Sequence, residues 1–252
     1  MSKSNLLKMK YNTYLIILGV FTYSIFMFSC SILPNIVPKK TSTPVTISTK
    51  KQYVTLISKD SNEQMVNILS KIPNIQLDLR YATTNNFMKK AMYPTTTNTT
   101  FLKLPAANAL LNIQKELNKK KLGLKIFDAY RPYFVTKQFW KLVHDERYVA
   151  NPIKGSGHNK GIAIDVTLIN LTIHEELNMG TGFDNFTDSA HHNFTAFSTT
   201  ILNNRLLLKT IMEKYGFKKF NTEWWHYSFD DSEQHPILNV SFTTLNQLTQ
   251  YY

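Results

Sequence analysis

Aliphatic residues recur at helical spacing in two long stretches of this chain. In residues 105–121 leucine and isoleucine return every three or four positions, proline takes the first position and Gly123 follows shortly after the end. The same spacing recurs in residues 201–215, and Gly216 follows at once. The aromatic-rich stretch 133–148 has a similar pattern. These patterns predict three helices.

Two other stretches have the character of strands. Residues 124–128 form a short apolar run directly after the first predicted helix. In residues 162–168 apolar positions alternate, so that isoleucine, valine and leucine share one face and Asp165 falls on the other, where it can face a cleft. Helices and strands alternate without regular βαβ repeats. This order predicts an α+β fold rather than a doubly wound sheet.

The first 30 residues have the pattern of a secretory signal. Three lysines precede the apolar run 14–28, which is shorter than the about 20 residues that span a membrane. The run ends at Cys30, the only cysteine of the chain, where a lipoprotein signal places its lipidated residue. We expect lipidation at Cys30. An uncleaved anchor and plain cleavage stay open, because the residues before Ser29 are bulkier than this signal usually has.

Residues 31–51 are rich in Ser, Thr, Pro and Lys and have no apolar period, which predicts a flexible tether. We therefore expect a signal at 1–30, a tether at 31–51 and one folded domain at 52–252. The expected location is outside the cytoplasm. The protein would be held on a membrane through a lipid at Cys30, facing the periplasm or the cell exterior.

Composition narrows the classes of partner and of metal site. The 252 residues carry a formal charge of +12, and an apolar share of 43% is enough for a core. The basic residues are spread in short runs, which favours a solvated surface, with loose attraction to an anionic membrane or wall polymer as the alternative. No nucleic-acid motif is present, and no nucleic-acid partner is expected. One cysteine excludes an intrachain disulfide and a thiolate metal site, so a metal would need histidine and carboxylate ligands.

The segment 156–165 reads Ser-Gly-His-Asn-Lys-Gly-Ile-Ala-Ile-Asp and offers two such ligands. His158 lies in a turn between two glycines, which let the backbone bend and a metal approach closely. Asp165 follows on the predicted strand. Seven residues separate the two, which suits one ligand from a loop and one from a strand. On its own, a histidine in such a turn is more often simply a turn residue.

The segment 223–226, Glu-Trp-Trp-His, supplies the rest of a hydrolytic centre. His226 would be the third ligand, and Glu223 would take a proton from the attacking water instead of binding the metal. Residues three apart on a straight strand point to opposite faces, so we expect the strand to begin after Glu223 or to bend there. The alternative is an aromatic core strand with a capped glutamate.

The segment 128–132, Asp-Ala-Tyr-Arg-Pro, follows a predicted strand. A following proline restricts Arg131, so that its guanidinium has a fixed direction. Amide hydrolysis develops negative charge on the carbonyl oxygen, and a fixed guanidinium stabilises that charge. A surface salt bridge explains the pentapeptide equally well.

Taken together, these segments resemble the D-alanyl-D-alanine dipeptidases, the VanX-type zinc D,D-dipeptidases. Segment 156–165 matches their S-x-H-x-x-G-x-A-x-D signature, and segment 223–226 matches E-x-x-H. Segments 78–87 and 179–184 are similar to two further stretches of the same enzymes. The likeness runs from about residue 77 to about residue 229, although the N-terminal signal and tether are absent from the cytoplasmic members.

The resemblance implies a single domain of the Hedgehog/D,D-peptidase type, with a small, mostly antiparallel sheet flanked by helices. It implies one Zn²⁺ per chain, with Glu223 as the general base and Arg131 stabilising the oxyanion. The implied zinc ligands are His158, Asp165 and His226. The implied substrate-binding residues are Asp184 and Tyr81 at the dipeptide's ammonium and Ser156 near its carboxylate. His191 and His192 match by position, with support or packing as the default role.

The implied reaction is hydrolysis of the D-Ala-D-Ala dipeptide to two D-alanines, in cell-wall peptide turnover or in glycopeptide resistance. An exported enzyme suits turnover better. One alternative is a zinc D,D-carboxypeptidase that acts on peptidoglycan stem peptides. The other is a non-catalytic cell-wall-binding lipoprotein, which would need neither Glu223 nor Arg131. The sequence leaves the oligomeric state open.

Overall fold

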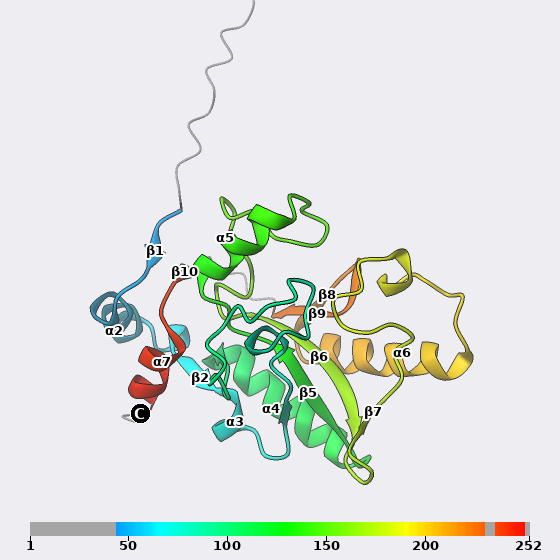
Figure 1. Cartoon of the computed structure of the whole chain (residues 1–252). Coiled ribbons are helices and arrows are strands. Elements are labelled where there is room, and N and C mark those ends of the chain that lie inside the picture. The colour runs from blue at the N-terminus through cyan, green and yellow to red at the C-terminus, as the bar shows by residue number, and fades with distance from the viewer. Residues whose placement is uncertain (1–43, 230–234, 250–252) are drawn as a thin grey trace, which may run out of the picture. The chain divides into compact units, whose positions relative to one another are not determined.

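The computed structural model describes residues 44–229 and 235–249 (Figure 1). The predicted signal, its Cys30 and residues 31–43 of the predicted tether lie outside these ranges. The strands are β1 (Thr46–Ile47), β2 (Met65–Asn67), β3 (Gln76–Leu77), β4 (Phe101–Lys103), β5 (Leu122–Asp128), β6 (Ala163–Asn170), β7 (Glu175–Glu176), β8 (Phe217–Phe220), β9 (Glu223–Phe229) and β10 (Ile237–Leu238). The α-helices are α2 (Lys50–Lys59), α3 (Ile68–Lys71), α4 (Leu104–Asn118), α5 (Tyr133–Leu142), α6 (Thr199–Lys214) and α7 (Phe242–Thr249).

One sheet forms the centre of the domain. Its strand order is β3-β5-β6-β9-β8, and β7 pairs with β6 beside this path. Only β3 and β5 run parallel; every other neighbouring pair of this sheet is antiparallel. Two separate strand pairs, β1 with β10 and β2 with β4, lie outside it. The predicted α+β class with a small, mostly antiparallel sheet and flanking helices is therefore confirmed.

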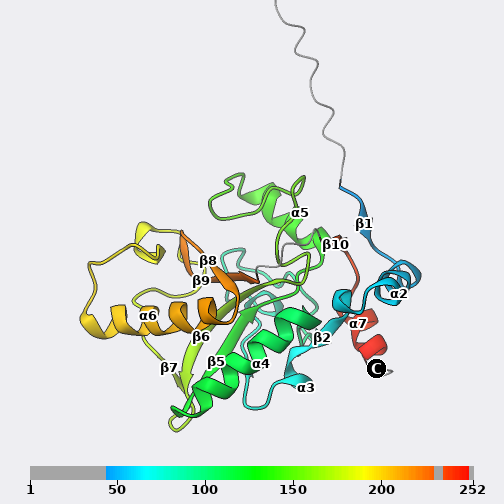
Figure 2. The same cartoon turned by 180° about the vertical axis from the view of Figure 1, so that it is seen from behind.

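Helices α4 and α6 cover one face of this sheet, and both lie in front of it in Figure 2. Their apolar faces join the aliphatic row of β5 and β6 in one core. That core includes Leu110, Ile113, Leu117, Leu124, Ile126, Ile164, Val166, Leu168, Leu208 and Ile211. Each such side chain contributes about 1.5–3 kcal/mol when it leaves water. The alternation read from residues 162–168 thus directs Asp165 to the face away from these helices.

The predicted helix ends are mostly close to the observed ones. Pro105 sits in the first turn of α4. This helix ends at Asn118, before Gly123, and Lys121 makes the turn into β5 with a positive φ. Gly216 follows α6 with φ +89°, a conformation that glycine adopts at little cost.

Two predicted boundaries differ from the structure. The helix expected at 133–148 ends at Leu142, because Val143 is extended and the Asp145 carboxylate accepts the backbone N–H of Arg147 to form a turn. The expected tether 31–51 overlaps β1, which pairs with β10, and the first residues of α2. Thr49 and Gln52 form a capping box at the start of that helix, a signal that composition alone hides.

Among the residues that the structure describes, no helix is both long and apolar enough to cross a membrane.

Candidate active site

Three acidic or imidazole side chains stand next to one another across the central sheet. Asp128 of β5 pairs with Asp165 of β6, and Asp165 pairs in turn with His226 of β9. The register between β5 and β6 shifts after Ile126, which places Asp128 opposite Asp165. Directly paired residues project to the same face of a sheet. Backbone hydrogen bonds of the sheet therefore determine where these side chains meet.

Strand β9 is irregular at the place where the sequence predicted a bend. Lys219 of β8 pairs with Tyr227, yet the next residue, Phe220, pairs with Glu223. Three residues of β9 therefore have no partner on β8 at this point. This bulge lets Glu223 approach His226, with Oε2 3.9 Å from His226 Nδ1. The predicted bend at Glu223 is confirmed.

His158 lies in a turn that its own backbone and a buried asparagine hold in place. The His158 carbonyl accepts the N–H groups of Arg131 and Gly161. The Asn159 amide donates to the Arg131 carbonyl at 2.8 Å and to Thr136 Oγ1 at 2.9 Å. Asn159 is fully buried. The turn is thus tied to the segment that carries Arg131 through Asn159, a residue with no role predicted from the sequence.

Gly161 is required by this turn. Its φ is +71°, and a Cβ at this position would lie 2.5 Å from Met65 Sδ. Gly161→Ala is expected to lower the free energy of unfolding by about 1–2 kcal/mol from the backbone conformation alone, and by more from the clash. Thermal unfolding measures the effect. Gly182→Ala is the matched control, because its Cβ would meet nothing within 4 Å. Equal melting temperatures for the two variants would contradict this view of the turn.

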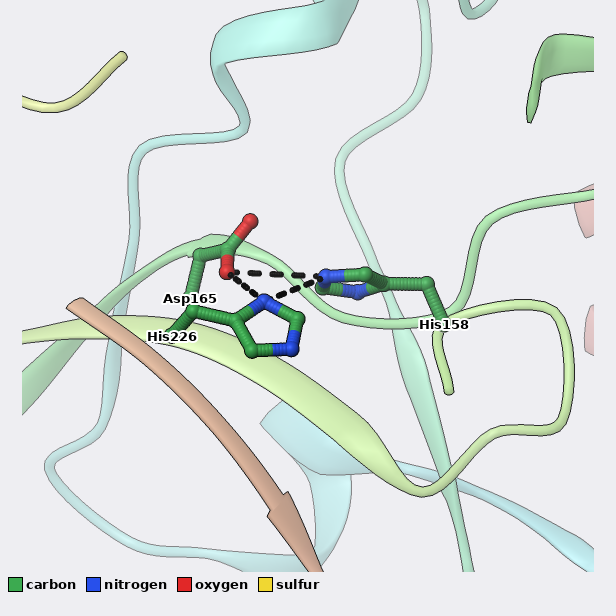
Figure 3. Close-up of side chains that lie close together, drawn as sticks. All are labelled: His158, Asp165 and His226. Atoms are coloured by element: carbon green, nitrogen blue, oxygen red, sulfur yellow. Dashed lines mark hydrogen bonds and ion pairs between the residues drawn. The ribbon is translucent and has the colours of Figure 1, made fainter. Parts of the chain in front are cut away.

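His158, Asp165 and His226 bring three potential ligand atoms together (Figure 3). His158 Nε2 lies 3.2 Å from His226 Nδ1 and 3.5 Å from Asp165 Oδ1, and the last two atoms are 2.9 Å apart. Ligands at about 2.0–2.2 Å from a tetrahedral zinc ion are about 3.3–3.6 Å from one another. Two nitrogens and one oxygen are also the donors that zinc prefers. The three residues therefore fit a zinc ion.

The hydrogen bonds and pKa shifts suit a metal ligand set. His158 Nδ1 donates to the Ala129 carbonyl at 2.6 Å, so that Nε2 faces the other two ligands. Burial lowers the pKa of His226, which favours its neutral ring. Burial works to raise the pKa of Asp165, but His158 and His226 outweigh it and hold this pKa below its ordinary value. Neutral imidazoles and an ionised carboxylate are the forms that bind a metal.

Asp128 fixes the direction of Arg131. Its Oδ2 accepts Arg131 Nε at 3.0 Å and Nη2 at 2.8 Å, and its Oδ1 accepts the Tyr93 hydroxyl at 2.7 Å. Burial alone would lower the pKa of Arg131. Nearby groups, Asp128 above all, instead raise this pKa well above its ordinary value. Arg131 Nη2 also lies 3.9 Å from Asp165 Oδ2. The alternative of a surface salt bridge is wrong, because this pair is buried beside the ligand cluster.

Asp128 belongs to segment 128–132 but had no predicted function, and Tyr93 was not among the predicted site residues. The signal for Asp128 was present, since a strand-terminal aspartate three residues before an arginine can pair with it. No local pattern points to Tyr93, which reaches Asp128 across 35 positions of the chain.

Two carboxyl groups beside the ligand cluster, the buried Glu223 and the half-buried Asp184, have raised pKa values. Burial, with the Asp165 and Asp184 carboxylates, raises the pKa of Glu223 well above its ordinary value. Burial raises the pKa of Asp184 to about 7, against hydrogen bonds from the Phe87 N–H and the Tyr81 hydroxyl. These bonds measure 3.2 and 3.0 Å. A higher pKa makes a carboxylate a stronger base.

A cleft of about 320 Å³ opens onto these groups. Its walls contain all eight predicted site residues of the domain: Tyr81, Arg131, Ser156, His158, Asp165, Asp184, Glu223 and His226. Half-buried rings of Phe87, Tyr148 and Phe186 complete one side. The size suits a small substrate, and the walls carry both acidic and basic groups.

Comparison with known proteins decides the family. Residues 61–245 match the family model for D-Ala-D-Ala dipeptidase, Peptidase_M15. The chain belongs to the D-Ala-D-Ala dipeptidase family. The D-alanyl-D-alanine dipeptidase of Escherichia coli strain K12 is 33% identical over 171 residues, which cover 66% of this chain and 85% of that protein. The enzyme of the same name from Enterococcus faecium is 32% identical over 172 residues, covering 61% and 85%.

A solved LdcB LD-carboxypeptidase aligns with 75% of this chain and 73% of its own, with 18% identity and a TM-score of 0.38. This likeness is too weak to bear on fold or substrate.

In this member of the dipeptidase family, two of the predicted site residues also form hydrogen bonds to neighbouring site residues. Ser156 is buried, and its Oγ accepts the backbone N–H of His158 at 3.2 Å, so it braces the turn as well as lining the cleft. Tyr81 donates its hydroxyl to Asp184 and so orients that carboxylate. His191 and His192 lie outside the cleft walls. Their Nε2 atoms are buried without a hydrogen-bond partner among the described residues, and burial lowers the pKa of His192 to about 3.

Proposed function

We propose that this protein is a zinc-dependent dipeptidase that hydrolyses D-Ala-D-Ala to two D-alanines. The observation that carries the proposal is the cluster of His158, Asp165 and His226, whose ligand atoms lie within 4.8 Å of one another at a cleft that also contains Glu223 and Arg131. Membership of the D-Ala-D-Ala dipeptidase family supports a peptidase of this kind. When bound, zinc supplies Lewis acidity that activates water and polarises a carbonyl group.

Glu223 and Arg131 perform the steps that belong to the protein. The Glu223 carboxylate accepts a proton from the attacking water and delivers it to the leaving amine nitrogen as the peptide C–N bond breaks. Arg131 stays charged because Asp128 neutralises it at short distance. Its fixed guanidinium stabilises the negative charge that develops on the carbonyl oxygen. Arg131 does not have to reorient during the reaction, since Asp128 holds its guanidinium through two hydrogen bonds.

Another group of the cleft wall suits the free amine of a dipeptide. Asp184 presents a half-buried carboxylate to the cleft, and Tyr81 and the Phe87 N–H orient it. An ammonium group compensates the charge of such a carboxylate and has the donors to bind it. Ser156 also lines the cleft, and we assign it to the substrate carboxylate, as the family resemblance implies.

Incubation of the purified protein with D-Ala-D-Ala tests the proposal. D-alanine should be released, release should stop with a chelator, and added zinc should restore it. L-Ala-L-Ala serves as the control substrate, and a stem pentapeptide ending in D-Ala-D-Ala serves as the competing one. Faster cleavage of the pentapeptide would favour the D,D-carboxypeptidase alternative. No cleavage of either D-peptide by the zinc-loaded protein would favour a binding protein.

The expected export and the lipid at Cys30 stay predictions from residues 1–30. The choice of wall turnover over glycopeptide resistance depends on them.

A further inference from the structure

Arg205 of α6 is a buried guanidinium that neutralises no carboxylate within ion-pair distance in the described part of the chain. Its N–H groups instead reach three backbone carbonyls. Nε donates to Met179 at 2.7 Å, Nη2 to Ser189 at 2.9 Å and Nη1 to His191 at 3.1 Å. Hydrogen bonds from a charged donor are stronger than those between neutral groups. One side chain thus ties α6 to both ends of the segment 179–191.

Aromatic rings flank this guanidinium. Its Cζ lies 4.7 Å from the ring centre of Phe197 and 5.9 Å from that of Trp224. The Trp224 indole N–H donates to Thr181 Oγ1 at 2.8 Å, so this ring also binds the segment. Trp224 directly follows Glu223 on β9. The segment is therefore connected both to α6 and to the strand that carries the proposed base and a proposed ligand.

The segment 179–191 contains Asp184 and little regular structure of its own. Between β7 and α6 it forms only a three-residue 3-10 helix at Asp188–Ala190 (Figure 1). The backbone of Asp184 has φ +60°, a value that residues other than glycine adopt uncommonly. Such a conformation persists only when its surroundings enforce it. The contacts of Arg205 at the two ends of the segment supply part of that enforcement.

We infer that Arg205 is a positioning residue that holds Asp184 in the orientation needed to bind the substrate's ammonium. This inference rests on the proposed function. Arg205 does not line the cleft and does not touch the reacting groups. Lysine cannot replace it, because one ammonium lacks the planar fork that reaches three carbonyls in different directions.

Arg205→Lys is expected to reduce kcat/KM for D-Ala-D-Ala roughly 10–100-fold, mainly through KM, because misplaced binding groups have effects of this size. Zinc content should stay at the wild-type value. Arg147→Lys is the matched control, since Arg147 is exposed and pairs only with its neighbour Asp145 among the described carboxylates. Hydrogen exchange should show faster exchange in residues 179–191 of Arg205→Lys, with α4 and β6 unchanged.

A double-mutant cycle with Asp184→Asn separates positioning from general support of the fold. If Arg205 acts through Asp184, Arg205→Lys should change kcat/KM less than about twofold in the Asp184→Asn background. Equal losses in both backgrounds, or unchanged exchange in 179–191, would overturn the inference while leaving the proposed function intact. Failure of both Arg205→Lys and Arg205→Gln to fold would assign Arg205 to the fold and also overturn it. An inactive wild type would refute the proposed function and this inference together.

Discussion

Glu223→Gln is expected to keep its zinc and to lower kcat for D-Ala-D-Ala by about 10²–10⁴-fold, the usual contribution of a positioned base. Glutamine has nearly the same shape, but its amide cannot take a proton from water. Burial raises the pKa of Glu223, so wild type has a stronger base here than an exposed glutamate. Steady-state kinetics and metal analysis on the same preparation measure both effects.

The control for this substitution is Glu213→Gln, the same change on the exposed side of α6. It should keep wild-type kcat and zinc. A Glu223→Gln enzyme with wild-type kcat would remove Glu223 from the mechanism. A variant that loses zinc together with activity would instead identify Glu223 as a ligand, which contradicts the role inferred for it.

His226→Ala should bind zinc far more weakly and lose measurable hydrolysis. Loss of a contact that only supports a metal ligand costs about 10–100-fold in affinity, and loss of a ligand costs more. His226 is the best ligand to remove, because its side chain is 18% exposed whereas those of His158 and Asp165 are 2% and 4% exposed. The substitution therefore disturbs packing least. Metal content after dialysis and the rate of D-alanine release are the measurements.

His144→Ala is the matched control for the histidine, since His144 is exposed on the segment after α5 and lies outside the cleft walls. Its zinc content and rate should equal those of wild type. If His226→Ala retained one zinc per chain and normal activity, the ion would bind elsewhere and the proposed centre would be wrong.

The local structure around His158, Asp165 and His226 could be predicted because these residues lie in short signatures with strong local constraints. Glycines around His158 and the alternation of residues 162–168 specified a turn followed by a strand, and the spacing of Glu223 and His226 required a bend. These inferences depended on backbone geometry within ten residues, whereas the expectation that the two segments meet at one site came from the family resemblance. The helices α4 and α6 followed from apolar periodicity for the same reason.

The supporting contacts could not be read in this way because they join distant parts of the chain. Tyr93 reaches Asp128, and Arg205 reaches back to Met179, through contacts that no local spacing reveals. The early start of the domain was missed for a similar reason. The pairing of β1 with β10 joins residues about 190 positions apart, and composition alone made residues 46–51 look like a linker.

Asp128, Asp165 and His226 lie on paired strands of the central sheet, which form a hydrogen-bonded frame. Asp184 and Ser156 lie on connecting segments. In the proposed mechanism, two of the three metal ligands and the base therefore belong to the sheet, whereas the residues proposed to bind the two ends of the substrate belong to segments outside it. Engineering of the connecting segments around an intact frame is a route to hydrolases for other small peptides.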